Sequence, residues 1–184
     1  MVQMNIQTKF LMLLIILVTL TNCRNKQNEV MPLDMNGVKE AINVAKQAKE
    51  KGNLPYGSVL TDANGKVLLK GENTINTDND CLAHAEINLI REACKLYDYK
   101  FLNSCVIYTS DEPCAMCSSA IYWSGIGKLV FGLSKKTFYD SFGRENPNWV
   151  FELGSREVFS KGGRKVKVVG PMLEDDVLKI HKIN

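Results

Sequence analysis

Five residues of this chain have the types and spacing of a metal centre. Pro113 precedes Cys114 and Cys117, and upstream His84 and Glu86 lie two residues apart. A Cys-x-x-Cys pair can form a disulfide, a redox pair or half of a metal site, but only a metal site also makes use of the histidine and the acid. Zinc binds imidazole nitrogen and thiolate readily. We therefore predict that His84, Cys114 and Cys117 bind Zn²⁺.

The elements that must position these residues are two helices, each directly after a strand. The pattern predicts one helix over about residues 84–95 and another over about residues 114–124, ended by Gly125. Pro113 suits the first turn of the second helix, where its missing donor is not needed. Residues at i and i+3 of a helix face the same way. The positive end of a helix also favours thiolate, the form of cysteine that binds metal.

Three ligands and one adjacent acid are typical of a catalytic zinc site rather than a structural one. A closed structural site needs four ligands, for which Cys81 is the nearest spare cysteine in the sequence. The other histidine, His181, belongs to a polar carboxy-terminal helix and is expected to be solvated. Zinc lowers the pKa of bound water from about 15.7 to about 7. Glu86 is then the candidate that carries a proton to a departing nitrogen, although an acid there could simply complement the helix dipole.

The rest of the chain predicts a covered sheet. Asn36 is expected to cap a first helix that Gly52 ends and that buries Val38, Ala41, Ile42, Ala45 and Ala48. Two strand-like runs, "YGSVLTD" and "KVLLKGEN", flank an Asn-Gly pair that predicts a hairpin. The strands "CVIYTS" and "KLVFGLS" alternate with helices, which indicates parallel neighbours. Residues 135–163 are expected to be irregular, and "KVKVVG" and "EDDVLKIHK" to form a last strand and a last helix.

Composition indicates one globular domain of ordinary polarity. The 184 residues are 45% hydrophobic and 23% charged, with a net charge of +3. Such a near-neutral domain attracts a polyanion weakly. The cluster Lys161, Arg164, Lys165 and Lys167 is expected to be the solvated side of a strand and its turn. Cys94 and Cys105 lie in apolar patterns and are expected to be small core residues.

The amino terminus differs in character from the domain. Residues 1–22 hold an unbroken apolar run of secretory-signal length, and Leu-Thr-Asn-Cys ending at Cys23 resembles a bacterial lipoprotein signal, with Asn22 larger than the usual residue. We expect residues 23–35 to be a polar tether and residues 36–184 the domain. A lipid on Cys23 at the cell envelope is one interpretation. The other is a start site annotated too early, which would leave the protein cytoplasmic.

From Asn36 to about Ser134 the chain resembles the cytidine and deoxycytidylate deaminase superfamily, in the branch of bacterial guanine deaminases and tRNA adenosine deaminases. The matching stretches are "NLPYGSVLTD", "GENTI", "AHAEINLIREAC", "IYTSDEPCAMCSSAIYW" and "GIGKLVFG". The resemblance implies a three-layer α/β/α fold around a five-stranded mixed sheet, commonly dimeric. It also implies zinc on the three ligands and proton transfer by Glu86. Beyond Ser134 the chain departs from the guanine deaminase pattern.

The resemblance also implies contacts to the substrate. Asn73 matches the asparagine that holds the base, and the backbone N–H of Ala85 is the expected contact to a ring carbonyl; Asn73 could instead only form a turn at the end of its strand. Trp123, in "AIYW", and Tyr56 are candidate walls for a planar base, or core aromatics.

The expected function is therefore zinc-dependent hydrolytic deamination of a free nucleobase or nucleoside, of the guanine or cytosine type, by a homodimer. One alternative is a tRNA adenosine-to-inosine deaminase. A further alternative is a non-catalytic zinc-stabilised binding protein.

Overall fold

The computed structural model describes residues 32–182 of the chain. The chain divides into two compact units, Met1–Asp34 and Met35–Asn184. The signal-like run and Cys23 lie outside the described residues, so the signal, the lipid and the compartment stay predictions. Among the helices of residues 32–182, none is long and apolar enough to cross a membrane.

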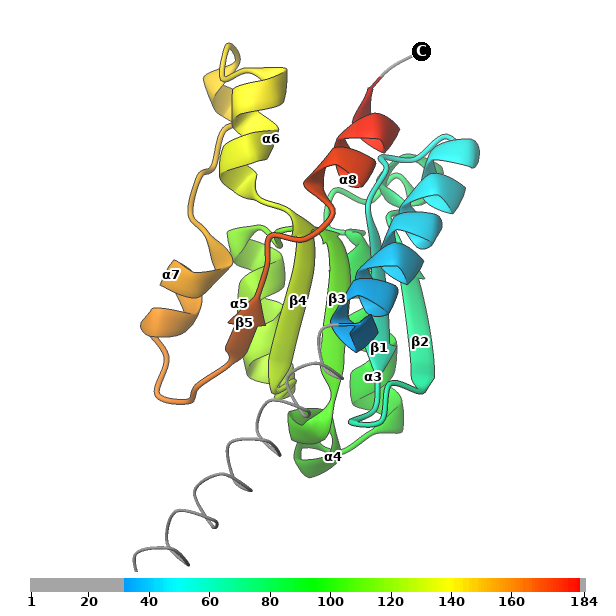
Figure 1. Ribbon diagram of the computed structural model, residues 1–184, viewed down its shortest axis with the longest axis vertical. Coiled ribbons are helices and arrows are strands. Elements are labelled where there is room, and N and C mark those ends of the chain that lie inside the picture. Colours follow the sequence, from blue (N-terminus) through cyan, green and yellow to red (C-terminus); the bar gives the residue numbers. More distant parts are fainter. Residues whose placement is uncertain (1–31, 183–184) are drawn as a thin grey trace, which may run out of the picture. The chain divides into compact units, whose positions relative to one another are not determined.

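A five-stranded sheet with the strand order β2-β1-β3-β4-β5 forms the centre of the second unit (Figure 1). β1 (Gly57–Thr61) and β2 (Val67–Glu72) form the predicted antiparallel hairpin. Gly65 in the turn has a φ of 84°, which glycine adopts without the strain that a side chain would bring. The Asn-Gly signal therefore located this hairpin correctly.

The other half of the sheet is parallel. β1 pairs antiparallel with β3 (Val106–Asp111), and β3, β4 (Lys128–Leu133) and β5 (Lys167–Val169) run parallel to one another. The alternation of strands and helices predicted this parallel arrangement.

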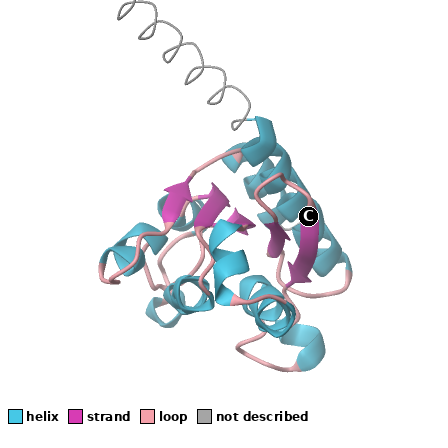
Figure 2. Cartoon of the chain, turned by 90° about the horizontal axis from the view of Figure 1, so that it is seen from below, coloured by secondary structure: helices cyan, strands magenta, loops and turns pink. Residues whose placement is uncertain are grey.

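Helices cover both faces of the sheet (Figures 1 and 2). The helix over residues 35–50 and α8 (Glu174–His181) lie on one face, and α3 (Ala85–Leu96) and α5 (Ala115–Ser124) lie on the other. Neighbouring strand residues enter opposite cores, as the pleat requires: Leu60, Ile107 and Leu129 pack toward α3 and α5, and Val59, Tyr108 and Val130 toward the other face. The expected three-layer α/β/α fold is confirmed.

The first helix keeps its predicted face but not its predicted start. All five predicted core positions are buried, and Gly52, with a φ of 84°, ends the helix. The chain is already helical at residue 32, so Asn36 is an exposed residue inside the helix rather than its cap, and residues 32–35 are not a tether. The low helix propensity of Gly37 argues against a helix at this position, yet Gly37 lies inside the helix. A Cβ on Gly37 would lie 2.3 Å from the Tyr108 ring, so its place in the helix is set by tertiary packing.

The expectation that residues 135–163 are irregular is wrong. They form α6 (Lys135–Phe142), a 3₁₀ turn (Pro147–Trp149) and α7 (Ser155–Ser160). These helices are short, and part of their capping comes from distant residues, which a local pattern cannot indicate. The structure also has two short helices that we did not predict, α2 (Ile75–Asp78) and α4 (Tyr99–Ser104).

The two non-ligand cysteines of the core prediction differ. Cys105 is buried as expected, but Cys94 is exposed. The buried stripe of α3 includes Leu89, Ile90 and Ala93. Cys94 follows Ala93 by one residue, a rotation of about 100° around the helix, so its side chain lies outside the stripe.

Candidate active site

Strand pairing brings the predicted site residues to one edge of the sheet. Because β1 is antiparallel to β3, the start of β1 lies beside the end of β3, and Gly57 pairs with Glu72 at the end of β2. Tyr56, Asn73 and the loop that leads into α5 therefore meet at this edge. The backbone N–H of Asn73 donates to the carbonyl of Tyr56 at 3.1 Å.

The three predicted zinc ligands lie together. His84 and Cys114 are the N-cap residues of α3 and α5, so the positive ends of both helices meet at the site. His84 Nδ1 lies 3.8 Å from Cys114 Sγ and 3.5 Å from Cys117 Sγ. All three ligand atoms are within 4.8 Å of one another.

This group has the dimensions of a tetrahedral zinc site. With Zn–N and Zn–S bonds of about 2.0 and 2.3 Å, ligand atoms around one zinc ion lie about 3.6 Å apart. The two distances from His84 Nδ1 are close to that value. No fourth His, Cys, Asp or Glu joins the group among residues 32–182, and the side chain of Cys81 is exposed outside it. The residues present therefore fit a three-ligand site.

The local electrostatics favour one thiolate even without a metal ion. Hydrogen bonds from Cys117 and His84 lower the pKa of Cys114 to about 3. The hydrogen bond to Cys114 and burial raise the pKa of Cys117 well above its usual range. A divalent cation that bound both cysteines would bind them as thiolates and release the proton of Cys117.

Glu86 is buried beside the candidate ligands. It is only 8% exposed, in the first turn of α3, and burial raises the pKa of its carboxyl to about 7. The negative charge of Cys114 adds to this shift. An acid that only complemented the helix dipole would lie in solvent, so burial favours the role in proton transfer.

Asn73 presents a buried donor that nothing in residues 32–182 accepts. Its side chain is fully buried, and its Oδ1 accepts a hydrogen bond from the backbone N–H of Ile75 at 3.1 Å. Its Nδ2 has no partner. The turn-forming role and the base-binding role therefore use different atoms of the same amide. Asn88, which the sequence analysis missed, holds this segment: its Nδ2 donates to the carbonyl of Glu72 at 3.0 Å.

Ala85 lies where the expected backbone contact requires it. It is the first residue of α3, so its N–H has no carbonyl one turn earlier in the helix. Ser58 Oγ donates to the carbonyl of Ala85 at 2.8 Å, which ties the start of α3 to β1. A Cβ on Gly71 would lie 2.4 Å from the same carbonyl oxygen, so only glycine allows this approach.

The two predicted aromatic walls differ. Tyr56 lies among the site residues: burial, Asp111 and Glu86 raise the pKa of its phenol. Trp123 does not join them. It is 79% exposed in the last turn of α5, about 13 Å along the helix from Cys114. The structure therefore does not place Trp123 beside the metal ligands of its own chain.

The expectation that His181 is solvated is wrong. Its side chain is 6% exposed, and its Nε2 lies 2.8 Å from Asp111 Oδ1. The His181 ring packs 5.2 Å from the rings of both Tyr56 and Phe138, measured between centroids. Asp111, at the end of β3, is 70 residues away in the chain. No local pattern signals such a pair, because the partner decides the burial.

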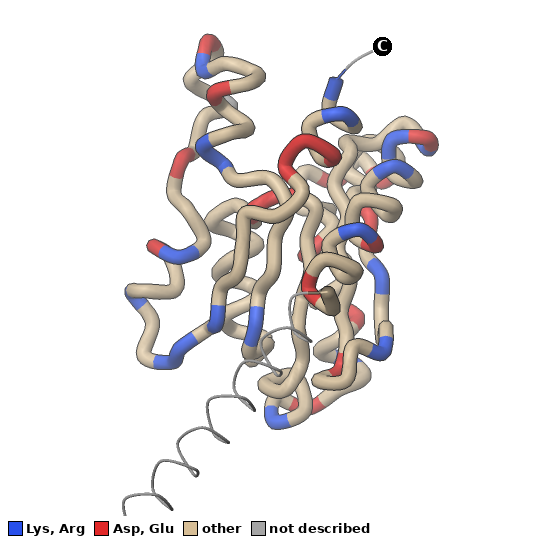
Figure 3. The backbone as a smooth tube through the Cα atoms, in the orientation of Figure 1, with Lys and Arg blue, Asp and Glu red and all other residues tan. Residues whose placement is uncertain are grey.

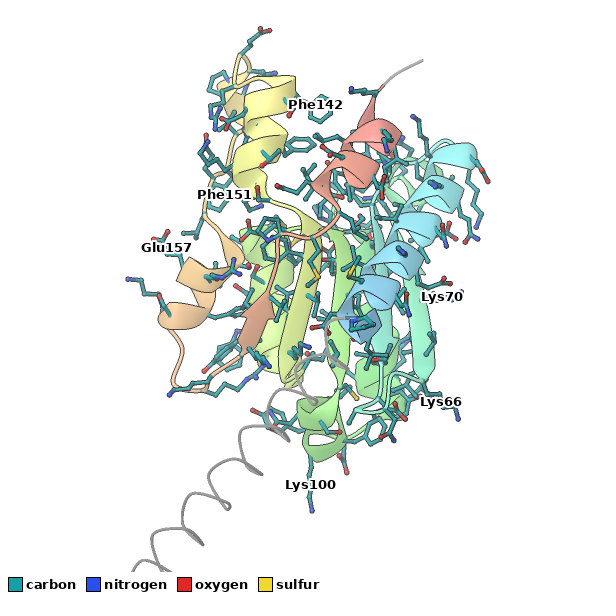
Figure 4. The ribbon with its side chains drawn as sticks, in the orientation of Figure 1. Lys66, Lys70, Lys100, Phe142, Phe151 and Glu157 are labelled. Carbon is teal, nitrogen blue, oxygen red and sulfur yellow. The ribbon has the colours of Figure 1, made fainter. Side chains whose placement is uncertain are left out.

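Two further acids fasten the carboxy-terminal part of the chain to this edge. Glu112 accepts hydrogen bonds from the backbone N–H and hydroxyl of Ser155 at 2.9 and 2.8 Å, and from the N–H of Lys135 at 3.2 Å. Glu174 accepts from the N–H and hydroxyl of Ser134. The starts of α6 and α7 are thus bound to the loop that carries Cys114. Figure 4 shows Phe142 of α6 extending toward α8 above the same edge.

The fold and this site are those of a deaminase family. A model of the cytidine and deoxycytidylate deaminase zinc-binding region matches residues 31–133. The chain belongs to that family.

Individual relatives act on different substrates. A probable cytosine deaminase of Schizosaccharomyces pombe is 34% identical over 154 residues, which cover 84% of this chain and 93% of the relative. A tRNA-specific adenosine deaminase of Bacillus subtilis is 42% identical over 95 residues, 52% of this chain and 58% of the relative. The solved guanine deaminase of Bacillus subtilis has a TM-score of 0.52 at 34% identity, covering 58% of this chain and 68% of that one.

Proposed function

We propose that this protein is a zinc-dependent hydrolytic deaminase of a free nucleobase or nucleoside, of the guanine or cytosine type. The observation that carries the proposal is the meeting, at one edge of the sheet, of the three-ligand group, the buried acid Glu86 and the unpartnered amide donor of Asn73. A protein that only bound zinc for stability would have no use for the last two groups.

In the proposed reaction, His84, Cys114 and Cys117 hold the zinc ion, which supplies water that ionises near neutral pH. Glu86 transfers one proton of the attacking water to a ring nitrogen, and then transfers the second proton, from the hydroxyl that the attack forms, to the amino group, which leaves as ammonia. Asn73 Nδ2 and the Ala85 N–H donate hydrogen bonds to acceptors of the base. A C–N bond is replaced by a C–O bond, water is consumed and ammonia leaves.

Two observations support a small substrate. The probable cytosine deaminase of Schizosaccharomyces pombe aligns over 93% of its own length and 84% of this chain, a longer match than that of the tRNA-specific relative. The rings of Tyr56, Phe138 and His181 form a continuous aromatic group at the same edge as the ligands, as a planar base requires.

The alternative substrate is adenosine in tRNA. The match to the tRNA-specific adenosine deaminase of Bacillus subtilis favours it, since that match has the higher identity over the segment it covers. RNA deamination with a steep salt dependence would support this alternative.

The test is ammonia release by the full-length, zinc-loaded protein from guanine, cytosine, isocytosine, adenine, their nucleosides and an adenosine-bearing anticodon stem-loop. We expect turnover of a base or nucleoside. Glu86→Gln should lower kcat by about 10²- to 10⁴-fold, the usual contribution of a general acid–base. Zinc content measured by mass spectrometry should be unchanged, because glutamine occupies nearly the same volume.

Three outcomes separate the alternatives. Deamination of the stem-loop alone would show that the alternative function, tRNA adenosine deamination, is the correct one. No ammonia release from any of these substrates at full zinc occupancy would favour the non-catalytic binding protein. A Glu86→Gln variant that keeps most of the activity would remove Glu86 from the mechanism.

The proposal includes a homodimer and, for the mature chain, a lipid on Cys23. The homodimer is proposed from the family resemblance. Sedimentation velocity of the full-length protein tests the dimer, and mass spectrometry of the mature amino terminus tests the lipid.

A further inference from the structure

A second hollow lies away from the metal ligands. It is open, encloses about 750 Å³ and lies between α7, β5 and the turn that joins them. Its lining includes Arg156, Arg164, Lys165 and Lys167, and no acidic residue. It adjoins the amino-terminal ends of β4 and β5, whereas the ligands follow the carboxyl end of β3. The six residues of β4 span about 20 Å, so the two sites are distinct.

This hollow contains the positive excess of the whole chain. Residues 156–167 hold five basic residues and one acid, a net charge of +4, whereas the chain as a whole has +3. The remaining residues hold 18 basic and 19 acidic side chains, a net charge of −1. Figure 3 shows the basic residues gathered on the turn before β5 and at the adjoining ends of β4 and β5. A domain that is otherwise slightly acidic thus concentrates positive charge at one place.

The lysines of this hollow are not neutralised by the protein. In the described part of the chain, the exposed side chains of Lys161, Lys165 and Lys167 form no ion pair, whereas five other lysines pair with acids. The charge of these lysines is therefore available to a bound anion.

The arginines make the frame of the hollow rigid. The guanidinium of Arg164 donates to the carbonyl oxygens of Ile121 and Ile126 at 3.0 and 3.1 Å, and also to that of Tyr122. This holds the turn before β5 against the end of α5. Arg156 donates to the carbonyl of Gly170 at 2.8 Å. The backbone that carries Lys165 and Lys167 is therefore held in place before any ligand binds.

An exposed aromatic ring, that of Trp123, is separated from the lining of the hollow by one other ring, that of Tyr122. The Arg164 guanidinium lies 4.8 Å from the centroid of the Tyr122 ring, and the Trp123 ring packs edge-on against Tyr122 with 5.4 Å between centroids. Trp123 is 79% exposed, the most exposed of the large hydrophobic residues that the structure describes. Cations and an exposed aromatic ring on one surface are the combination that binds the phosphate and the base of one nucleotide.

We infer that this hollow binds a nucleotide, with its phosphate on Lys165 and Lys167 and its base stacked on Trp123. The ligand is a free nucleotide or one unit of a single-stranded nucleic acid, because both present the same phosphate and base. Lysines on an edge strand also prevent sheets from pairing with each other. That alternative explains Lys165 and Lys167 but predicts no saturable binding and no role for Trp123.

The test is fluorescence quenching of the full-length protein carrying Trp149→Phe, which leaves Trp123 as its single tryptophan. The probes are uridine monophosphate, a five-residue oligouridylate and inorganic phosphate. We expect saturable quenching by both nucleotide probes. Lys165→Ala/Lys167→Ala should weaken binding at least tenfold and lower the slope of log K against log salt by about two, one for each phosphate contact. Equal affinity for the two probes identifies a free nucleotide, and at least tenfold tighter oligouridylate binding identifies a strand.

The matched control is Lys66→Ala/Lys100→Ala, which removes two exposed lysines on the β1–β2 turn and on α4 (Figure 4). It should change affinity less than twofold. Trp123→Ala, followed by calorimetry, should weaken the oligouridylate about tenfold and leave inorganic phosphate unaffected. Binding that survives in Lys165→Ala/Lys167→Ala, or inorganic phosphate that binds as tightly as uridine monophosphate, would overturn the inference. Circular dichroism confirms that each variant is folded, and ammonia release tests the metal site independently.

Discussion

Asn73 shows how one side chain can serve structure and chemistry with separate atoms. Its Oδ1 completes a turn with the N–H of Ile75, and its Nδ2 is buried without a partner in the described residues. A buried donor left unpaired costs about 1–3 kcal/mol. Under the proposed function, a substrate acceptor at this position would recover that cost.

Asn73→Asp separates the two roles, because aspartate keeps the turn acceptor and loses the donor. We expect kcat/KM to fall by about 5- to 150-fold, equivalent to about 1–3 kcal/mol for the lost hydrogen bond. The measurement is steady-state ammonia release on the best substrate, with Asn64→Asp in the exposed β1–β2 turn as control. Unchanged kcat/KM would mean that Asn73 only forms the turn.

Asp111 and His181 form a second buried interaction at the level of single residues. Both side chains are largely buried, at 13% and 6% exposure, so removing one leaves the other without its partner. We expect His181→Phe to lower the free energy of unfolding by about 1–3 kcal/mol. A double-mutant cycle with Asp111→Asn, measured by urea unfolding, should give a coupling energy of at least about 1 kcal/mol. Additive effects would contradict a direct interaction.

At the scale of elements, one carboxylate directly after β3 and one at the start of α8 hold α6 and α7 at the site edge. Glu112 binds the first residues of α6 and α7, and Glu174 binds Ser134 at the start of α6. Each acid accepts hydrogen bonds from the donors that a helix start leaves unpaired. Short helices that are marginal alone thereby become defined parts of the fold.

The contribution of Glu174 to the stability of the fold depends on pH. Partial burial raises the pKa of Glu174, but hydrogen bonds from Thr137 and Ser134 outweigh it and bring the pKa below the ordinary value of 4.5. A lowered folded-state pKa means that the stabilisation is present above about pH 4.5 and is lost as the pH falls through the folded pKa.

We therefore expect wild type to be more stable than Glu174→Gln at pH 7, with the difference shrinking as the pH falls below 4.5. Urea unfolding at several pH values measures it. Glu157→Gln, an exposed acid on α7 without an ion pair (Figure 4), should show no such trend. A difference that stays constant down to pH 3 would exclude a contribution from the carboxylate.

At the scale of the molecule, the metal group joins elements that are distant in the sequence. His84 begins α3, and Cys114 and Cys117 begin α5, so an ion bound to all three crosslinks the helices of one face across 30 residues of chain. A ligand that binds only the folded state stabilises it by mass action.

Removing zinc should therefore lower the Tm of the whole domain, with a difference that grows with free zinc concentration. Differential scanning calorimetry with and without a chelator measures this. Cys114→Ser should lose most of the difference, whereas Cys81→Ser, at an exposed cysteine outside the group, should keep it. Equal Tm values with and without zinc in the wild-type protein would contradict metal binding at this group.

The sequence by itself determined the five strands, the Asn-Gly hairpin between the first two and the candidate metal group of His84, Cys114 and Cys117. These depend on local signals: periodicity, a proline at a helix start, and cysteines three residues apart. The candidate role of Glu86 follows from its spacing to His84, whereas Asn73 was expected from the family resemblance.

Only the tertiary structure decided the surroundings of these residues. It buried His181 against Asp111, turned Trp123 away from the ligands and formed α6 and α7 in a segment without a clear pattern. In each case the free energy comes from contacts between residues far apart in the chain, and a local pattern carries no information about which distant residue will be the partner.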